Sequence, residues 1–181
     1  SARISGTAES MSAVSPFAAI SARAGDCYIE AEGRYLGGSG SIIVSGMLYV
    51  PIRSLAKAYG ADVEWREETR SVDLYSTGER LGSGDNFYSS DEGYWLARII
   101  SAEANGEPMG GKIMVGNVIL NRGESADFPN TIYGVIFDRQ HGVQFTPTIN
   151  GTVYNEPTEE SVIAAKLCLD SYYLSKTALY F

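Results

Sequence analysis

The sequence is poor in the residues that build metal centres and thiol nucleophiles. Its 181 residues include one histidine, His141, and two cysteines, Cys27 and Cys168. A zinc site with paired histidines therefore cannot form within one chain, and no G-x-S-x-G motif marks a serine nucleophile. We expect free, buried thiols rather than a Cys27–Cys168 bridge, because two cysteines are too few for a disulfide scaffold. His141 is expected in a loop, and no metal ion or cofactor is predicted.

Basic clusters and long apolar runs are also absent. The net charge is −8 at pH 7 with histidine neutral, both halves of the chain are acidic, and lysines and arginines form no run. Nucleic acid is not an expected partner, because binding it requires clustered basic residues that release counterions. No stretch of about 18 apolar residues predicts a membrane span. No signal-peptide pattern follows Ser1, so we expect either that a signal peptide has been removed or that this sequence starts after one.

What is present indicates an α+β protein with two parts. Hydrophobic residues make up 44% of the chain, enough for a real core. Residues 25–76 are predicted to be a small α/β domain with strands around one helix, and residues 91–181 a mainly α domain. Residues 77–90 are rich in glycine and serine and predict a linker. Residues 1–24 are predicted to be an N-terminal extension, because the first twenty are small and polar and could be poorly ordered.

Turn residues carry the prediction for the first part. Glu32-Gly33 and Ser45-Gly46 each separate two short apolar runs, as hairpin turns do. Pro51 suits the first turn of a helix, and Gly60 is placed to end it. Two further strands are predicted from alternating apolar and polar residues: Val63–Trp65 and Val72–Tyr75.

The second part has helical periodicity. Four helices are expected, and they begin near Ser90, Pro108, Thr131 and Thr158. Ser89 or Ser90 can cap the first helix, and Asn105-Gly106 is a good stop for it. The segment around Gln144–Thr146 and Asn150-Gly151 is expected to be a loop or strand excursion, that is, a small β insertion.

Glu103 is the candidate catalytic residue. It lies at the end of an apolar helix face that includes Ile99 and Ile100. Burial there would raise the pKa of its carboxyl group, as a general acid requires. From this geometry alone, a structural role is the commoner interpretation: a glutamate at a helix end usually caps the helix or forms an ion pair. Glu107 is the rival: it could stabilise the start of the second helix, or form a two-carboxylate pair with Glu103.

Four ordered blocks of the second part resemble the SleB/CwlJ-type cell wall hydrolases, which include the spore-cortex-lytic enzymes of endospore-forming bacteria. The resemblance covers about residues 92–181. The blocks are Ala102–Pro108, Val115 to Asn121-Arg122, Phe128–Ile132 with Val135-Ile136, and Gln144-Phe145-Thr146. Several blocks in order at the right spacing are more specific than any single motif.

This resemblance implies a lysozyme-like fold and the activity of a peptidoglycan lytic transglycosylase. Glu103 matches the single catalytic glutamate of such enzymes. It would protonate the bond between N-acetylmuramic acid and N-acetylglucosamine, and then act as base while the muramic 6-hydroxyl closes a 1,6-anhydro ring. The implied partner is the peptidoglycan glycan strand. The implied location is outside the cell: a secreted protein in the cell wall or spore envelope of a Gram-positive spore-forming bacterium.

Three alternatives remain open. A hydrolytic muramidase would use Glu107 or Asp138 to activate water. An N-acetylmuramoyl-L-alanine amidase is disfavoured by the lone histidine. A catalytically inactive protein would bind peptidoglycan without changing it.

The resemblance also suggests substrate contacts. Tyr94 and Tyr133 are two of twelve tyrosines that could offer flat faces to sugar rings. The expected substrate-binding residues are Glu107, Gln144, Phe145, Thr146, Tyr154 and Tyr180. Members of the family often have other residues at positions 105, 112 and 146, where this chain has Asn, Lys and Thr, but none of these differences removes the proton donor.

The first part resembles the small domain named for the N-terminus of copper amine oxidases. The residues that carry this resemblance are Gly46–Arg53, Leu55-Ala56, Gly60–Trp65 and Val72–Leu74. The name implies no copper here, because the residues support no metal site. The resemblance implies wall attachment, spacing or formation of a homodimer.

Overall fold

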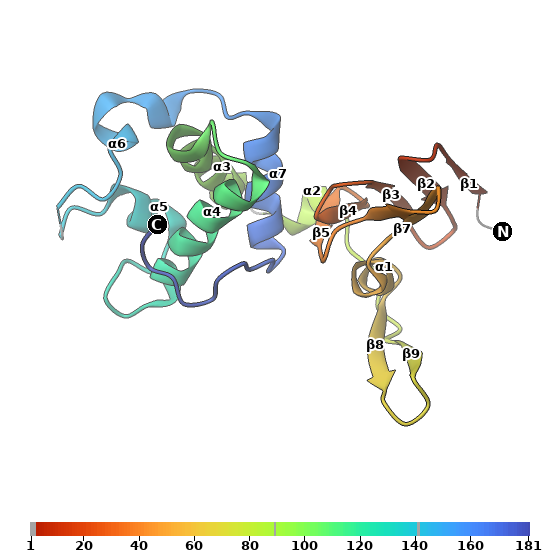
Figure 1. The fold of residues 1–181 in the computed structure, drawn as a ribbon. Coiled ribbons are helices and arrows are strands. Elements are labelled where there is room, and N and C mark those ends of the chain that lie inside the picture. Colours follow the sequence, from red (N-terminus) through yellow and green to blue (C-terminus); the bar gives the residue numbers. More distant parts are fainter. Residues whose placement is uncertain (1–2, 89, 141) are drawn as a thin grey trace. The chain divides into compact units, whose positions relative to one another are not determined.

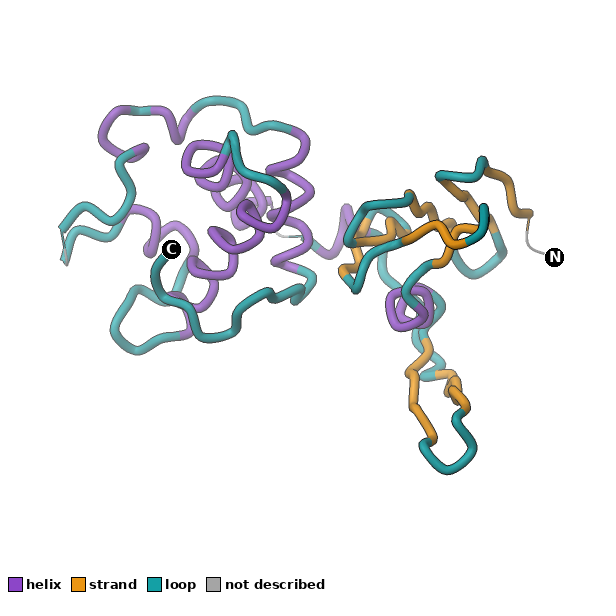
Figure 2. Tube along the Cα trace, viewed as in Figure 1, coloured by secondary structure: helices purple, strands orange, loops and turns teal. Residues whose placement is uncertain are grey.

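The computed structural model describes residues 3–88, 90–140 and 142–181 (Figure 1). The chain divides into two compact units, one ending at Phe87 and one beginning at Tyr88, and this division lies within the predicted linker. We call them the sheet unit and the helical unit and describe each by itself. Strands occur in the first and helices dominate the second, so the predicted α+β class is confirmed (Figure 2).

The sheet unit is built on a five-stranded antiparallel meander. Its strands follow one another in sequence order. They are β1 (Arg3–Gly6), β2 (Ser10–Val14), β3 (Ala19–Arg23), β4 (Tyr28–Ala31) and β5 (Arg34–Gly37). Alternate residues such as Ile20, Ile29 and Leu36 point into one small core, as the two-residue period of a strand requires.

The prediction of a poorly ordered extension is wrong for residues 3–24. These residues form β1, β2 and β3, and β3 pairs with β4 from Ile20↔Ala31 to Ala22↔Ile29. The buried residues in this stretch are mostly alanines, including Ala13, Ala18 and Ala22. Alanine gives little hydrophobic contrast in a sequence, which is why the strands were missed.

Both predicted hairpin turns of the sheet unit are confirmed. Glu32 and Gly33, between β4 and β5, have φ of 53° and 75°. Ser45 and Gly46, between β6 (Ile42–Val44) and β7 (Met47–Tyr49), have φ of 51° and 76°. Positive φ at both central residues is the type I′ arrangement whose twist matches that of the flanking strands.

One helix and two further strands follow in the sheet unit, where the sequence predicts them. Helix α1 (Ile52–Ala58) begins directly after Pro51. Gly60, at φ 63°, then turns the chain so closely that a Cβ atom would meet the Glu79 carbonyl. Strands β8 (Ala61–Arg66) and β9 (Ser71–Ser76) form a two-stranded ribbon, and the short helix α2 (Gly84–Phe87) ends the unit.

The β8–β9 ribbon has one apolar and one polar face. Trp65 and Leu74 belong to its apolar face, yet their side chains are 49% and 57% exposed. On the opposite face Arg66 forms an ion pair with Asp73 and a hydrogen bond to the Tyr75 hydroxyl. The apolar face is therefore open to solvent within this unit.

The helical unit packs three long helices around one core. The elements are α3 (Ser90–Ala104), α4 (Met109–Glu124), α5 (Ile132–Phe137), α6 (Pro147–Asn150), the 3-10 helix η1 (Thr152–Tyr154) and α7 (Glu159–Leu169). Helices α3, α4 and α7 contact one another, and Leu96, Ile99, Val118 and Leu167 are fully buried. None of the helices in the described part of the chain combines the length and apolar character that crossing a bilayer needs.

The helix starts predicted at Pro108, Thr131 and Thr158 are confirmed. The Thr131 side chain accepts a hydrogen bond from the Gly134 N–H, and the Thr158 side chain accepts one from the Ser161 N–H. The expected cap at Ser89 or Ser90 lies outside the residues whose side chains the structure describes.

The predicted β insertion is wrong. The described residues of the helical unit contain no strand, and the segment between α5 and α7 forms α6 and η1 instead. Pro147 occupies the first turn of α6, where its missing N–H costs nothing. Gly151, at φ 83°, then reverses the chain into η1.

Buried polar side chains on α4 hold the segment that follows α7. The Asn117 side chain accepts a hydrogen bond from the Leu174 N–H at 2.8 Å and donates one to the Tyr172 carbonyl at 3.1 Å. Further along, the Asn121 amide donates to the Ala178 carbonyl at 2.9 Å, and the Arg122 Nε donates to the Leu179 carbonyl at 2.8 Å. These groups, which we call the α4 polar ladder, pair the backbone of a segment that has no helix or strand of its own.

Candidate active site

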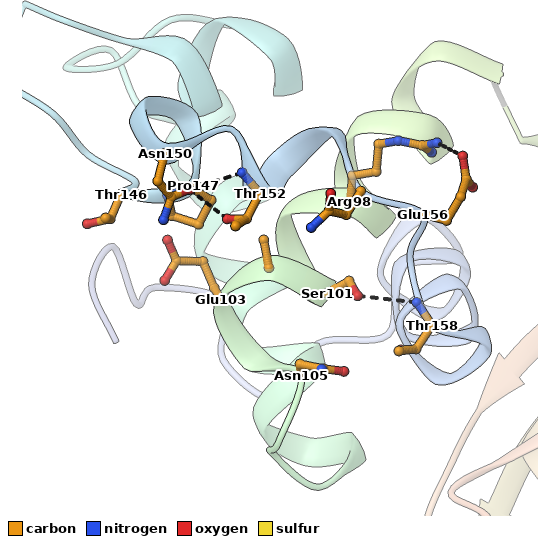
Figure 3. Close-up of a pocket in the computed structure, with 12 residues that line it drawn as sticks. Arg98, Ser101, Glu103, Asn105, Thr146, Pro147, Asn150, Thr152, Glu156 and Thr158 are labelled. Carbon is orange, nitrogen blue, oxygen red and sulfur yellow. Dashed lines mark hydrogen bonds and ion pairs between the residues drawn. The ribbon is translucent and has the colours of Figure 1, made fainter.

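A cleft of about 520 Å³ opens beside the C-terminal half of α3 (Figure 3). Ser101, Glu103 and Asn105 line it from α3 and the turn that follows. The opposite wall comes from the α6–η1 segment, and Thr158 lies at the end nearest α7. The cleft thus lies between elements that are far apart in the sequence.

Glu103 lies one residue before the end of α3, and its carboxylate projects toward Thr146 and Pro147 on the opposite wall (Figure 3). The side chain is partly buried, and the loss of hydration raises the pKa of its carboxyl group above the usual range. Among the described residues, no side chain forms a hydrogen bond or ion pair with this carboxylate. The group can therefore hold a proton at higher pH than a free glutamate, and its oxygens face open space.

Lys112 fixes the turn that ends α3. Its side chain is buried, and its ammonium group donates hydrogen bonds to the carbonyls of Asn105, at 3.3 Å, and Glu107, at 2.5 Å. The same ammonium group forms an ion pair with Glu160 on α7 at 3.1 Å. A cation is favourable at the negative end of a helix dipole. Lys112 therefore helps to set the position of Glu103; its sequence position gave no sign of this role.

The opposite wall is held by hydrogen bonds within its own turn. The Asn150 side-chain oxygen accepts hydrogen bonds from the Thr152 N–H at 3.0 Å and the Thr152 hydroxyl at 2.8 Å. Pro147 is buried. Thr146, one of the predicted substrate-binding residues, lines the cleft directly opposite Glu103 (Figure 3).

An arginine, Arg98, lines one end of the cleft. Arg98 is 8% exposed, and its Nη2 donates to Oε1 of Glu156 at 2.5 Å, while the Glu156 side chain is 87% exposed. The Arg98 guanidinium also stacks 3.8 Å from the centre of the Tyr94 ring. Its Nε is buried and has no hydrogen-bond partner among the described residues. Sequence reasoning missed Arg98, although a charged residue on the buried face of α3 was a signal that could have found it.

The two acids considered as partners of Glu103 do not line the cleft. Glu107 is exposed in the turn between α3 and α4, where its backbone carbonyl accepts a bond from Lys112. Asp138 is buried, and its carboxylate accepts a hydrogen bond from the Gln140 N–H. The described residues contain no group of three or more His, Cys, Asp or Glu side chains that could hold a metal ion, and His141 lies outside them.

Other predicted substrate contacts lie elsewhere in the helical unit. Phe145 is 1% exposed, so the prediction that its ring faces a sugar is wrong; it fills the core behind the cleft wall. Gln144 accepts a hydrogen bond from Arg122 at 3.3 Å. Tyr180 is exposed, with the Arg122 guanidinium 5.1 Å from its ring centre. Tyr154 belongs to a group of aromatic rings beyond the cleft.

Comparison with known proteins agrees with the division into two units. Residues 106–181 match the model of the cell wall hydrolase family, and residues 39–82 match that of the copper amine oxidase N-terminal domain. The first match starts just after Glu103 and does not include it.

Individual relatives are similar to the helical unit. A spore cortex-lytic enzyme of Bacillus cereus is 36% identical over 96 residues, which are 53% of this chain and 36% of the relative. One from Bacillus subtilis is 35% identical over 94 residues, 52% of this chain and 30% of the relative. The chain thus spans about a third of the length of these curated relatives.

Solved structures match the same region. The catalytic domain of the germination-specific lytic transglycosylase SleB from Bacillus anthracis is 35% identical, with a TM-score of 0.47, over 55% of this chain and 77% of that domain. The catalytic domain of SleB from Bacillus cereus is 36% identical with the same TM-score and coverage. By sequence, the helical unit is thus similar to the cell wall hydrolase family, and the sheet unit is similar to the copper amine oxidase N-terminal domain.

Proposed function

We propose that the helical unit is a peptidoglycan lytic transglycosylase that cleaves the bond between N-acetylmuramic acid and N-acetylglucosamine, with Glu103 as acid and then base. The observation that carries the proposal is the Glu103 carboxyl group. It is partly buried, has a raised pKa and faces a cleft of about 520 Å³ with no partner among the described residues. The relatives named as spore cortex-lytic enzymes and lytic transglycosylases support it.

In the proposed reaction Glu103 first donates a proton and then regains one. Protonated Glu103 donates its proton to the glycosidic oxygen, and the bond from that oxygen to the muramic C1 breaks. The Glu103 carboxylate then takes the proton from the muramic 6-hydroxyl, while the oxygen of that hydroxyl forms a bond to C1. The products are a 1,6-anhydro-muramic end and a free 4-hydroxyl on N-acetylglucosamine, and no water is consumed.

The carboxylates of the cleft favour this reaction over hydrolysis. Inverting hydrolysis needs a second carboxylate to activate water, and a retaining glycosidase needs one as nucleophile. Among the described residues that line the cleft, Glu156 is the one other acid, and its carboxylate forms an ion pair with Arg98. Internal attack by the 6-hydroxyl removes the need for such a group. A hydrolytic muramidase remains the second candidate, with Glu156 in the role first considered for Glu107 and Asp138.

We further propose that the sheet unit attaches the chain to the wall or to a second copy of itself. The exposed apolar faces of its hairpins, which include Trp65 and Leu74, support an attachment role. Since the relatives are spore cortex-lytic enzymes of Bacillus species, we also propose that the protein acts outside the cell membrane, on the wall or spore cortex of a spore-forming bacterium.

The test is mass spectrometry of soluble fragments released from purified vegetative and cortex peptidoglycan. Wild type should release anhydro-muropeptides from at least one substrate, and Glu103→Gln should release none. Glu107→Gln is the matched control, because it changes an exposed glutamate four residues away and should retain activity. Reducing muramic ends would instead identify a hydrolase, and new free amino groups an amidase. Binding without any change in the wall would leave the inactive binding protein as the explanation.

A further inference from the structure

Five aromatic rings gather on the surface formed by α3, α5 and η1. Tyr133 and Phe137 on α5 have ring centres 4.5 Å apart, and Phe137 and Tyr154 on η1 have theirs 6.5 Å apart. Each of these neighbours is tilted by 33° from the next. We call Tyr133, Phe137 and Tyr154 the aromatic row.

Trp95 of α3 supports the whole row from below. Its ring stands edge-on to Tyr133 at 5.2 Å, to Phe137 at 5.2 Å and to Tyr154 at 6.1 Å, with interplanar angles of 67° to 87°. Edge-to-face contacts of this kind are favourable because the positive ring edge meets a negative ring face. The row is thus held in place before any ligand arrives.

The outer rings of the row remain open to solvent. Tyr133 is 53% exposed and Tyr154 is 58% exposed. Core packing therefore does not account for these two tyrosines, because much of each side chain still meets water. A contiguous exposed aromatic surface marks a binding site more often than isolated exposed residues do.

The row is continuous with the cleft through shared elements. Tyr94 contacts Trp95 with ring centres 5.0 Å apart, and its other neighbour is the guanidinium of Arg98, which lines the cleft. Thr152 lines the cleft from η1, the same turn that carries Tyr154. Trp95 and Glu103 are eight residues apart on α3, about 12 Å of helix rise. A polymer that leaves the cleft past Arg98 would therefore meet the row.

We propose that the aromatic row binds sugar rings of the glycan strand outside the cleft, so that the enzyme grips the strand beyond the bond that it cuts. This inference rests on the proposed function, because it takes the substrate to be a polysaccharide. Tyrosine rings suit a sugar, since the ring stacks on its apolar C–H face and the hydroxyl can bond to a sugar hydroxyl.

The experiment compares long and short glycan strands as substrates. The strands are freed of stem peptides and separated by length, so that the short fraction fills the cleft alone. For Tyr133→Ala/Tyr154→Ala we expect KM on long strands to rise about tenfold with kcat little changed, because two rings that stack on the strand are lost. On short strands both constants should match those of wild type.

Two controls separate binding from folding. Tyr133→Phe/Tyr154→Phe keeps both rings and should keep most of the preference for long strands. Leu174→Ala removes a similarly exposed apolar side chain from another part of the unit and should change neither constant. An equal loss on short and long strands, or an unchanged length preference in the double alanine variant, would overturn the proposal.

A binding assay keeps this inference separate from the proposed reaction. In the Glu103→Gln background, the same long and short strands are titrated by calorimetry with and without the double alanine change. If wild type cleaves no glycan and the long-strand affinity still depends on the two tyrosines, the reaction is wrong and the aromatic row stands. If cleavage occurs and the affinity does not depend on them, the row is not a glycan site.

Discussion

The two units differ in how far their amphipathic elements are buried. In the helical unit the apolar stripe of α3 is closed, with Leu96, Ile99 and Ile100 fully buried against α4 and α7. In the sheet unit the β8–β9 ribbon leaves Trp65 and Leu74 about half exposed. A two-stranded ribbon is marginally stable by itself in water. The comparison teaches that α3 finds its apolar partners within the helical unit, whereas the apolar face of the β8–β9 ribbon stays largely exposed within the sheet unit.

The largest expected effect tests whether the chemistry belongs to the helical unit. Glu103→Gln should lower the rate of glycan cleavage by about 10²–10⁴-fold, since it removes the proton donor. The variant should also be more stable than wild type at neutral pH, because burial opposes the charged carboxylate that it replaces.

The sign of the pH dependence follows from the raised pKa of Glu103. The folded state holds this proton more tightly than the unfolded state, so wild-type stability falls as pH rises from the ordinary pKa through the folded one. The stability gain of Glu103→Gln should therefore appear above that window and vanish below it. Thermal melts at several pH values check this, and a gain that is equal at every pH would contradict the burial of the charge.

The next effect tests how firmly the helical unit holds its site. Lys112→Ala should lower the free energy of unfolding by about 2–4 kcal/mol, because two carbonyls lose a donor and a cavity forms. Lys112→Gln should cost less, since an amide can still donate to the turn. Urea denaturation measures both variants, and an alanine no worse than the glutamine would show that the turn does not depend on this side chain.

A smaller loss is expected from the α4 polar ladder. Asn121→Ala should cost about 1–3 kcal/mol, because two backbone carbonyls after α7 lose their donor. Limited proteolysis should then cut within residues 171–181 sooner than in wild type. Asn130→Ala, at an exposed position, serves as the control. Equal protection in both variants would mean that the ladder does not hold the segment.

The smallest stability effect is expected in the sheet unit. Trp65→Ser/Leu74→Ser should change the free energy of unfolding by less than about 0.5 kcal/mol for each residue, as exposed substitutions do. Its attachment to peptidoglycan or its self-association should nevertheless fall, which pull-down on wall material and light scattering can measure. Glu64→Ser changes the polar face of the same ribbon and is the control. A large loss of stability in the apolar variant would break the contrast between the two units.

Local features of the fold could be predicted from the sequence where one residue dictates the backbone. The turn at Ser45-Gly46 could be predicted because glycine readily takes the positive φ that such a turn needs. The helix starts at Thr131 and Thr158 could be predicted because a threonine hydroxyl can accept a hydrogen bond from a backbone N–H of the first turn. The placement of Glu103 on an apolar helix face could be predicted from the helical period, but its catalytic role was inferred from the resemblance of residues 102–108 to a known family.

Features that depend on tertiary packing could not be predicted. The alanines of β2 and β3 bury too little area to stand out in a sequence. The burial of Phe145 could not be predicted, because residues in a loop have no regular spacing that shows which side chains face the core. Lys112 and Arg98 gain their roles from carbonyls and a glutamate supplied by other elements.

The α4 polar ladder has a consequence for the order of events during synthesis. Asn117 is fully buried, and its partners lie more than fifty residues later in the chain, in the segment after α7. Until the ribosome has released that segment, the Asn117 amide has only water to bond, and closing the core over it would cost an unpaired polar group. The core of the helical unit therefore cannot be completed stepwise from its N-terminal end. The helical unit can close its core only after residues 172–179 have been made and can reach Asn117.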